Sequence, residues 1–255
     1  MKEYLKSISF FKIIVITFKT MRCRHGFFLK IKNLIAFYIG YVKYKKLRKN
    51  NKFILNTKDL FPRIYDKTSL TALDPVYFYQ DTWCAKKIFE SMPEHHYDIG
   101  SKADMVGIIS QFVPTTMVDI RPLTVKLFNL TFMEGNILSL PFEDNSIHSL
   151  SSICVIEHIG LGRYGDPLDQ FGSEKAVLEL FRVLAPLGNL YISVPIDKEN
   201  KIYFNAHRAF TREYILDIFK PLELIEEKYI FGNNLIDVCK KENGFGTGLY
   251  HFRKK

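Results

Sequence analysis

The feature that most constrains the fold is an alternation, from residue 94 onward, between short runs of β-forming residues and stretches with helical periodicity. Such alternation is typical of parallel sheets whose strands are joined by right-handed helical crossovers. It predicts an α/β fold with a doubly wound, mostly parallel sheet of seven strands, closed by a hairpin joined through Gly244, Gly246 and Gly248. The expected strands are 94–99, 115–120, 130–134, 147–155, 188–195, 222–230 and 248–254, and the expected helices are 102–112, 174–185 and 211–219.

Length and charge limit the function. The 255 residues, 47% of them hydrophobic, can bury a substantial core. The formal net charge is +9, but residues 1–52 hold 14 of the 36 lysines and arginines and a single acid, Glu3. The rest of the chain holds 22 basic and 26 acidic residues, so it does not attract phosphates by its overall charge. We therefore expect no nucleic-acid partner.

Residues 1–52 form a basic extension in which apolar stretches stand beside clustered lysines. Lysines flank and interrupt the apolar run at 8–18 before it reaches the length of a membrane span, so a transmembrane helix is not expected. A second apolar run at 34–42 precedes a basic cluster at 43–49. Three interpretations stay open: amphipathic helices on an anionic membrane surface, helices packed on the core or a partner, and a targeting peptide.

The segment at 53–73 has no clear period and is interpreted as a linker, which leaves 74–255 as the second domain. The four cysteines are widely scattered, without the spacing of a disulfide framework or a zinc site. His95 and His96 also lack paired ligand spacing, and we expect them at the surface or at a strand entry. These patterns predict no metal and a cytoplasmic location, peripheral at the inner membrane face if the extension binds lipid.

A glycine-rich loop with several polar side chains follows the strand expected at 147–155. Ligands bind at the ends of parallel strands, so this loop is a candidate substrate site, although a structural Ω-type loop explains its glycines equally well. An unperturbed histidine has a pKa close to neutrality, so His158 is a candidate general base; the alternative is that it hydrogen-bonds the backbone. The candidates are Glu157 and His158 as catalytic groups, and Arg163, Tyr164, Asp166, Asn205, His207 and Arg208 as substrate-binding groups.

Several blocks of the alternating part follow one another in a recognisable order. They are Tyr97-Asp98-Ile99-Gly100, Asp119, Leu140–Ser146, Cys154–His158 and Glu179–Pro195. Their order and spacing resemble those of class I S-adenosylmethionine-dependent methyltransferases. The block Gly-Leu-Gly-Arg-Tyr-Gly-Asp-Pro at 160–167 further resembles an uncharacterised branch of that superfamily, a domain of unknown function.

The resemblance implies a Rossmann-like methyltransferase fold with S-adenosylmethionine as cofactor. In that family a glycine after the first strand lets the backbone approach the cofactor, a role that falls on Gly100. By the same likeness, Asp98 meets the ammonium end directly or through water, Asp119 accepts the ribose hydroxyls, and Asn136 accepts the adenine amino group. The family's turn has two or three glycines, whereas this turn has one.

Two hypotheses of different classes follow. The first is an S-adenosylmethionine-dependent methyltransferase acting on a small-molecule or glycan-type acceptor, with a role in surface polysaccharide synthesis. The alternative is a methyltransferase-like fold without catalysis that serves as a membrane-associated binding or scaffold module, an interpretation motivated by the single-glycine turn. A sugar-nucleotide enzyme on a dinucleotide fold ranks last, because no G-x-G-x-x-G motif follows the first strand.

Overall fold

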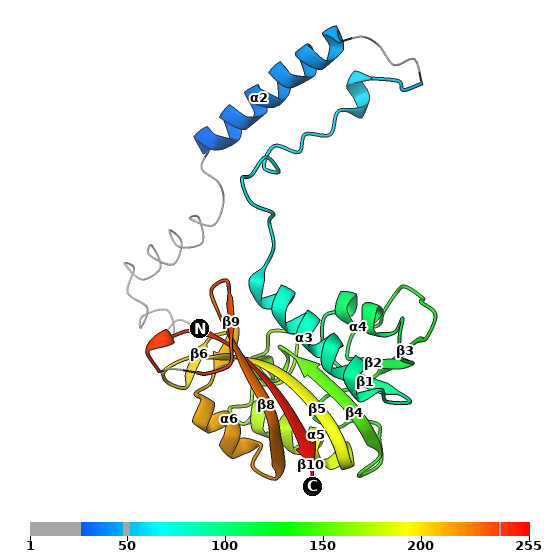
Figure 1. Cartoon of the computed structure of the whole chain (residues 1–255), viewed down its shortest axis with the longest axis vertical. Coiled ribbons are helices and arrows are strands. Elements are labelled where there is room, and N and C mark those ends of the chain that lie inside the picture. Colours follow the sequence, from blue (N-terminus) through cyan, green and yellow to red (C-terminus); the bar gives the residue numbers. More distant parts are fainter. Residues whose placement is uncertain (1–26, 48–51, 240) are drawn as a thin grey trace, which may run out of the picture. The chain divides into compact units, whose positions relative to one another are not determined.

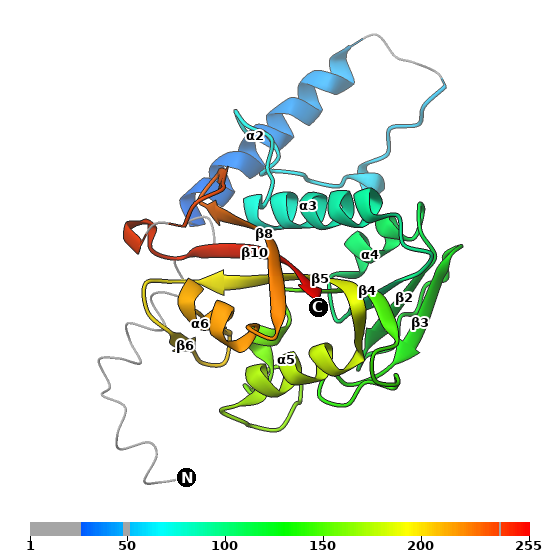
Figure 2. The ribbon, with the colours of Figure 1, turned by 60° about the horizontal axis from the view of Figure 1, so that its bottom comes forward.

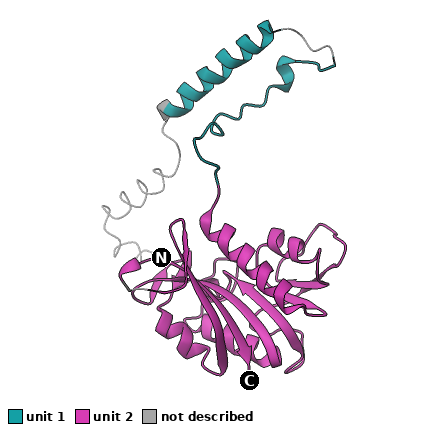
Figure 3. Ribbon diagram, in the orientation of Figure 1, with its two compact units in different colours: residues 1–72 teal, residues 73–255 magenta. Residues whose placement is uncertain are grey.

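The computed structural model describes residues 27–47, 52–239 and 241–255. The chain divides into two compact units, residues 1–72 and 73–255 (Figure 3). The first unit contains helix α2 (Phe27–Lys46) and the short 3-10 helix η2 (Thr57–Asp59). The second contains the sheet and the remaining described elements (Figure 1).

Helix α2 is apolar along its middle and basic in its last turn, where Lys43, Lys45 and Lys46 suit the negative end of the helix dipole. Within the described residues, no helix is both long and apolar enough to cross a membrane. The apolar run at 8–18 lies outside the described residues. The exposed apolar side chains of α2 are Leu29, Ile31, Leu34, Ile35, Tyr38, Ile39, Val42 and Tyr44.

The second unit is built on one sheet of eight described strands, in the order β3-β2-β1-β4-β5-β10-β8-β9. The strands from β3 to β5 run parallel, whereas β10 is antiparallel to β5 and β8, and β9 is antiparallel to β8. The predicted α/β architecture is confirmed, and the predicted number of seven strands is wrong. The strands are β1 (His96–Ile99), β2 (Thr115–Asp119), β3 (Leu130–Glu134), β4 (Ile147–Ile153), β5 (Leu184–Ile196), β8 (Leu222–Phe231), β9 (Asn234–Ile236) and β10 (Gly246–Lys254).

Helices cover both faces of this sheet (Figure 2). Helices α3 (Pro75–Ser91) and α4 (Ala103–Ile109) pack on one face, and α5 (Gly172–Val183) and α6 (Arg212–Ile218) pack on the other. Successive side chains of a strand point to opposite faces, so the central strand β5 contributes to both cores. Burying each large apolar side chain stabilises the fold by about 1.5–3 kcal/mol. From β5, Leu190, Ile192 and Val194 join the α5 side, and Tyr191 joins the α3 side.

Short strands account for the differences between the predicted and the observed sheet near β8 and β10. Strand β9 follows a turn at Gly232-Asn233 and, with the 3-10 helix η4 (Lys241–Asn243), separates β8 from β10. The predicted simple hairpin is therefore wrong, although β8 and β10 do pair. Gly246 and Gly248 lie within β10 instead of in the connection. Strands β6 (Lys201–Tyr203) and β7 (His207–Ala209) form a separate two-stranded ribbon.

A buried polar network joins β1 to β4. His96 is fully buried and is the first residue of β1, which fits the expected strand entry and not the surface alternative, whereas His95 is partly exposed. The His96 ring lies 2.8 Å from Ser149 Oγ and 2.9 Å from Ser151 Oγ. Ser151 donates to Asp98 and so accepts from Nε2–H of His96. Burial lowers the pKa of His96 to about 3, so its ring is neutral in this network.

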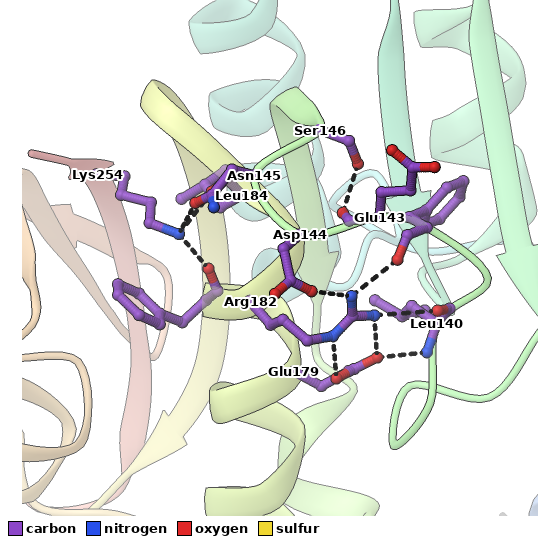
Figure 4. Close-up of polar contacts among 11 residues, drawn as sticks. Leu140, Glu143, Asp144, Asn145, Ser146, Glu179, Arg182, Leu184 and Lys254 are labelled. Atoms are coloured by element: carbon purple, nitrogen blue, oxygen red, sulfur yellow. Dashed lines mark hydrogen bonds and ion pairs between the residues drawn. The ribbon is translucent and has the colours of Figure 1, made fainter.

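Two of the sequence blocks that carry the family resemblance are joined by Arg182 of α5 (Figure 4). Its guanidinium donates to both carboxylate oxygens of Glu179 at 2.9 and 2.7 Å, and to Asp144 at 2.7 Å. It also donates to the carbonyls of Phe142 and Leu140 at 2.8 and 3.1 Å. These contacts hold the loop before β4 against α5. The residues of both blocks that contact Arg182 therefore have a structural role.

Replacing Arg182 by alanine is expected to lower the free energy of unfolding by about 2–3 kcal/mol. Several charge-assisted hydrogen bonds disappear, each worth about 1.5–3 kcal/mol when shielded, and partial exposure reduces their sum. The matched control is Lys220→Ala, whose ion pair with Asp217 is exposed, and it should cost less than about 0.5 kcal/mol. Urea unfolding measures both variants, and equal losses would contradict this account.

Candidate functional site

A cavity of about 240 Å³ lies at the carboxyl ends of β1, β2 and β4. Ligands of open parallel sheets bind at this edge. Most of its wall is apolar, with side chains that include Ile99, Val118, Ile120, Ile137, Leu138 and Val155. Of the predicted site residues, those that line it are Gly100, Asp119, Asn136, His158, Tyr164 and Asp166.

Gly100 forms the turn after β1. Its φ of +73° belongs to the left-handed region that favours glycine. Its N–H donates to the carbonyl of Val118 at 2.8 Å. A Cβ atom here would lie 3.1 Å from Val155 Cγ1 in the cavity wall. This one glycine therefore brings the backbone to the cavity.

Asp98 does not line the cavity. Its buried carboxylate accepts the backbone N–H and the hydroxyl of Ser101 at 3.0 and 2.6 Å, and the hydroxyl of Ser151 at 2.5 Å. Burial raises the pKa of Asp98 to about 6 against these hydrogen bonds. The side chain is fully buried, so the expected contact with a cofactor ammonium has no support, and Asp98 instead ties the turn to β4.

Asp119 ends β2 and faces the cavity. One carboxylate oxygen accepts the backbone N–H and Nε of Arg121 at 2.8 and 3.1 Å, and the other accepts Nη2 of Arg121 at 3.1 Å. A carboxylate offers about four acceptor positions, so one position of Asp119 stays open. Sequence reasoning missed Arg121, although it stands two residues beyond Asp119 and lines the same cavity.

Asn136 lies at the same part of the cavity wall. Its side-chain oxygen accepts the backbone N–H of Leu138 at 2.9 Å, which fixes the side chain in a turn. An amide oxygen has a second lone pair for a ligand donor. Beside Asn136, a Cβ on Gly135 would lie 2.6 Å from Val118, so glycine keeps this wall close to β2. The apolar walls, the amide of Asn136 and the carboxylate of Asp119 together fit an adenosine moiety.

His158 closes another side of the cavity from the 3-10 helix η3 (Ile156–His158). Its Nδ1 lies 2.7 Å from the carbonyl of Ala206. A carbonyl only accepts, so Nδ1 carries the hydrogen and Nε2 keeps a lone pair. Burial, with Arg163 nearby, lowers the pKa of His158 to about 4. His158 is therefore neutral at physiological pH and is a weak base.

Glu157 is buried behind His158 and does not line the cavity. Its Oε1 lies 3.6 Å from Nε2 of His158, and its Oε2 has no hydrogen-bond partner among the described residues. Burial raises the pKa of Glu157 to about 8, so the pair consists of a neutral acid and a neutral imidazole. The neighbouring Cys154 thiol contacts Gln80 and Ser193 at 3.1 and 3.2 Å.

The carboxylate of Asp166 stabilises the loop after η3, to which it belongs. Asp166 accepts the backbone N–H groups of Gly160, Gly162 and Tyr164 at 2.6, 3.3 and 3.3 Å. Burial raises the pKa of Asp166, but these hydrogen bonds lower it further, so the pKa lies below its ordinary value. Asp166 therefore organises the loop that presents Tyr164 and Arg163.

Arg208 has a structural position instead of the predicted substrate contact. It is 7% exposed, and its guanidinium donates to the carbonyls of Ile159 and Asp169 at 2.5 and 2.9 Å. These acceptors belong to the loop that begins at η3, so Arg208 stabilises the loop by hydrogen bonds to its two ends. His207 stacks near Tyr203 and does not line the cavity, and neither do Asn205 and Arg163.

A family model described as "Caenorhabditis protein of unknown function, DUF268" matches residues 142–232. The match includes the loop after η3 and Arg208, but it leaves out β1, β2 and the Gly100 turn. No curated protein matches the sequence.

Solved structures are similar to this chain in fold. A protein assigned as a sarcosine dimethylglycine methyltransferase from Galdieria sulphuraria has a TM-score of 0.53 and 16% identity, covering 72% of this chain and 92% of its own. The N-methyltransferase NodS from Bradyrhizobium japonicum WM9, in complex with S-adenosyl-L-homocysteine, has a TM-score of 0.51 and 14% identity over 76% and 91%. The second unit therefore has the Rossmann-like methyltransferase fold.

The fold alone does not specify the reaction. The cyclase SpnF has a TM-score of 0.53 and 13% identity, covering 68% of this chain and 80% of its own. It is described by cyclisation and not by methyl transfer. Function must therefore be argued from the residues of the cavity.

Proposed function

We propose that this protein is an S-adenosylmethionine-dependent methyltransferase whose cofactor binds in the cavity at the ends of β1, β2 and β4. The observation that carries the proposal is that Asp119 and Asn136 share one apolar cavity with the Gly100 turn. Apolar walls suit adenine, the carboxylate suits the ribose hydroxyls, and the amide suits the adenine amino group. The fold similarity to NodS, solved with S-adenosyl-L-homocysteine, supports the same class of ligand.

When bound, S-adenosylmethionine supplies a methyl group on a positively charged sulfur. In this proposal Gly100 admits the close approach of the ligand to the backbone, and Asp119 fixes its orientation. His158 offers Nε2 as an acceptor that holds the hydrogen of the incoming nucleophile, and the buried carboxyl group of Glu157 lies 3.6 Å from that atom. Because His158 is a weak base, orientation of the acceptor contributes more to the rate than proton removal does.

The proposed acceptor is a small molecule or a glycan, in a pathway of surface polysaccharide synthesis. The loop after η3 offers an exposed aromatic ring, Tyr164, beside Arg163. An aromatic face with polar groups at its rim suits sugar rings and other compact polar molecules. Of the predicted substrate-binding residues, Arg163, Tyr164 and Asp166 belong to this loop, and the first two are the contacts we propose.

Methyl transfer is tested with the full chain, tritiated S-adenosylmethionine and a fractionated polar metabolite and glycan extract. The expected result is label transferred to one fraction, reduced at least about tenfold in His158→Ala and abolished in Asp119→Ala. The matched control is His148→Ala, an exposed histidine on β4 that does not line the cavity. Transfer that survives in Asp119→Ala would contradict the proposed site.

We further propose that α2 binds an anionic membrane surface. Its exposed apolar side chains and its three terminal lysines combine the two contributions that hold interfacial helices on lipid. This cytoplasmic, peripheral association would bring the enzyme to lipid-linked glycan precursors at the inner face of the membrane.

Vesicle sedimentation tests the membrane proposal. The full chain is expected to bind vesicles that contain anionic lipid and not to bind zwitterionic vesicles. Binding should weaken as the salt concentration rises. Replacing Lys43, Lys45 and Lys46 by glutamine should weaken binding more than about tenfold, at about 1 kcal/mol for each charge. The control replaces the exposed Lys126 and Lys220 in the same way. Equal losses in both variants, or equal binding to neutral vesicles, would contradict the proposal.

The alternative function is a methyltransferase-like module that binds partners without catalysis. One observation favours it: Arg121 already occupies both oxygens of Asp119, the position that the ribose would need. In this alternative the ion pair is permanent and the cavity takes no adenosine. Failure of S-adenosyl-L-homocysteine to bind the folded wild-type chain would favour the module over the enzyme.

A further inference from the structure

Two arginines contact the ring of Tyr164 at the edge of the cavity. The guanidinium carbon of Arg121 is 4.9 Å from the ring centroid, and that of Arg163 is 5.1 Å from it. The ring of His158 makes an edge contact with Tyr164, with centroids 5.6 Å apart. Tyr164 is 41% exposed, so a ligand can reach this group. The ring face attracts both cations and holds together two charges that would otherwise repel each other.

The negative groups around this edge are already neutral or occupied. Asp166 accepts three backbone N–H groups of its own loop. The pKa of about 8 keeps Glu157 protonated at neutral pH. Asp119 compensates one arginine only, Arg121. The ionised groups at this edge, Arg121 and Arg163 with Asp119 and Asp166, balance in charge, but both carboxylates are already bound within the protein.

Arg163 keeps most of its donors for a ligand. Among the described residues, Nη1 of Arg163 donates to the carbonyl of Ala206 at 2.8 Å, and no carboxylate lies within ion-pair distance. Nη1 also lies 3.3 Å from Nδ1 of His158, which donates to the same carbonyl. A guanidinium has five N–H donors in a planar fork. Arg121 uses Nε and Nη2 on Asp119, which leaves Nη1.

We propose that Arg163 and Arg121, both in contact with the ring of Tyr164, form an anion site, and that the acceptor presents a carboxylate or a phosphate group to it. This inference rests on the proposed methyltransferase function and names the class of its acceptor. Paired N–H donors of a guanidinium bind both anions in the same way.

The anion site is tested by the side-chain Nε–H signals of arginine in nitrogen-15 NMR spectra of the full chain with S-adenosyl-L-homocysteine. Acetate, inorganic phosphate and sodium chloride are titrated at matched ionic strength. Acetate or phosphate should shift the signals of Arg163 and Arg121 to saturation, and chloride should not. Arg163→Gln should weaken this binding at least about tenfold. The control Arg253→Gln, at the opposite edge of the sheet beside Asn189, should leave it unchanged.

The response to each anion distinguishes the two classes of acceptor. Saturation by phosphate alone assigns a phosphate-bearing acceptor, and saturation by acetate alone assigns a carboxylate-bearing one. Shifts that chloride reproduces, or that Arg163→Gln retains, overturn the anion site. Calorimetry of S-adenosyl-L-homocysteine on the same samples separates the two claims: cofactor binding without an anion response overturns this inference alone. Absence of cofactor binding overturns the proposed function.

Discussion

Replacing Glu157 by glutamine is expected to stabilise the protein, by an amount that grows as the pH rises from about 5 to about 8. Burial raises the pKa of Glu157 from its ordinary value of 4.5 to about 8. Between these values the folded state keeps a proton that the unfolded chain releases. Rising pH therefore favours unfolding of the wild type by about 1.4 kcal/mol for each pH unit. Glutamine has the same shape and does not titrate, so the variant lacks this loss.

The measurement is the free energy of unfolding in urea at pH 5, 6.5 and 8 for the wild type and Glu157→Gln. The two proteins should be similar near pH 5, and the variant should be more stable by several kcal/mol at pH 8. Glu143→Gln is the matched control, because Glu143 is exposed, and its curve should follow that of the wild type. Parallel curves for all three proteins would show that Glu157 ionises as freely in the folded state as in the unfolded one.

Replacing Asp119 by alanine is expected to weaken binding of S-adenosyl-L-homocysteine about 100-fold or more. Two hydrogen bonds from ribose hydroxyls to a carboxylate are lost, each worth about 1.5–3 kcal/mol. Because Arg121 is then left without its partner, the double variant Asp119→Ala with Arg121→Ala separates loss of the carboxylate from exposure of the cation. Both variants should bind weakly in calorimetry, and thermal unfolding verifies that both are folded.

Replacing Arg121 alone by alanine is expected to strengthen binding of S-adenosyl-L-homocysteine. Asp119 has one open acceptor position beside Arg121, whereas two ribose hydroxyls need two. The guanidinium therefore competes with the ribose, and its removal should tighten binding of S-adenosyl-L-homocysteine about tenfold. Weaker binding in Arg121→Ala would mean that this arginine holds the ligand and does not compete with it.

The long strands could be predicted from sequence, and the short ones could not. Runs of β-forming residues mark β2, β4 and β8, whose observed bounds lie within two residues of the predicted ones, whereas β5 begins four residues before its predicted start. The three-residue strands β6, β7 and β9 are too short to show a period. The turn at Gly232-Asn233, with its glycine at a φ of +57°, is the hairpin signal that would have revealed β9.

For the site, position at a strand end was predictable and side-chain direction was not. The family resemblance implied Gly100 and Asp119, and both lie where parallel strands end at the ligand edge. Asp98 precedes Gly100 by two residues, yet its side chain turns toward Ser151 of β4. Arg208 is buried by carbonyl groups of a loop far from it in sequence. No local pattern encodes either contact, because both depend on how distant segments meet.

The most direct test of the central claim is calorimetric titration of the full wild-type chain with S-adenosyl-L-homocysteine. The account predicts saturable binding at one site, with heat that becomes more negative as temperature rises, since the ligand buries apolar surface in the cavity. Absence of heat at every temperature, in protein that unfolds cooperatively, would contradict the claim that the cavity at Asp119 and Asn136 is a cofactor site.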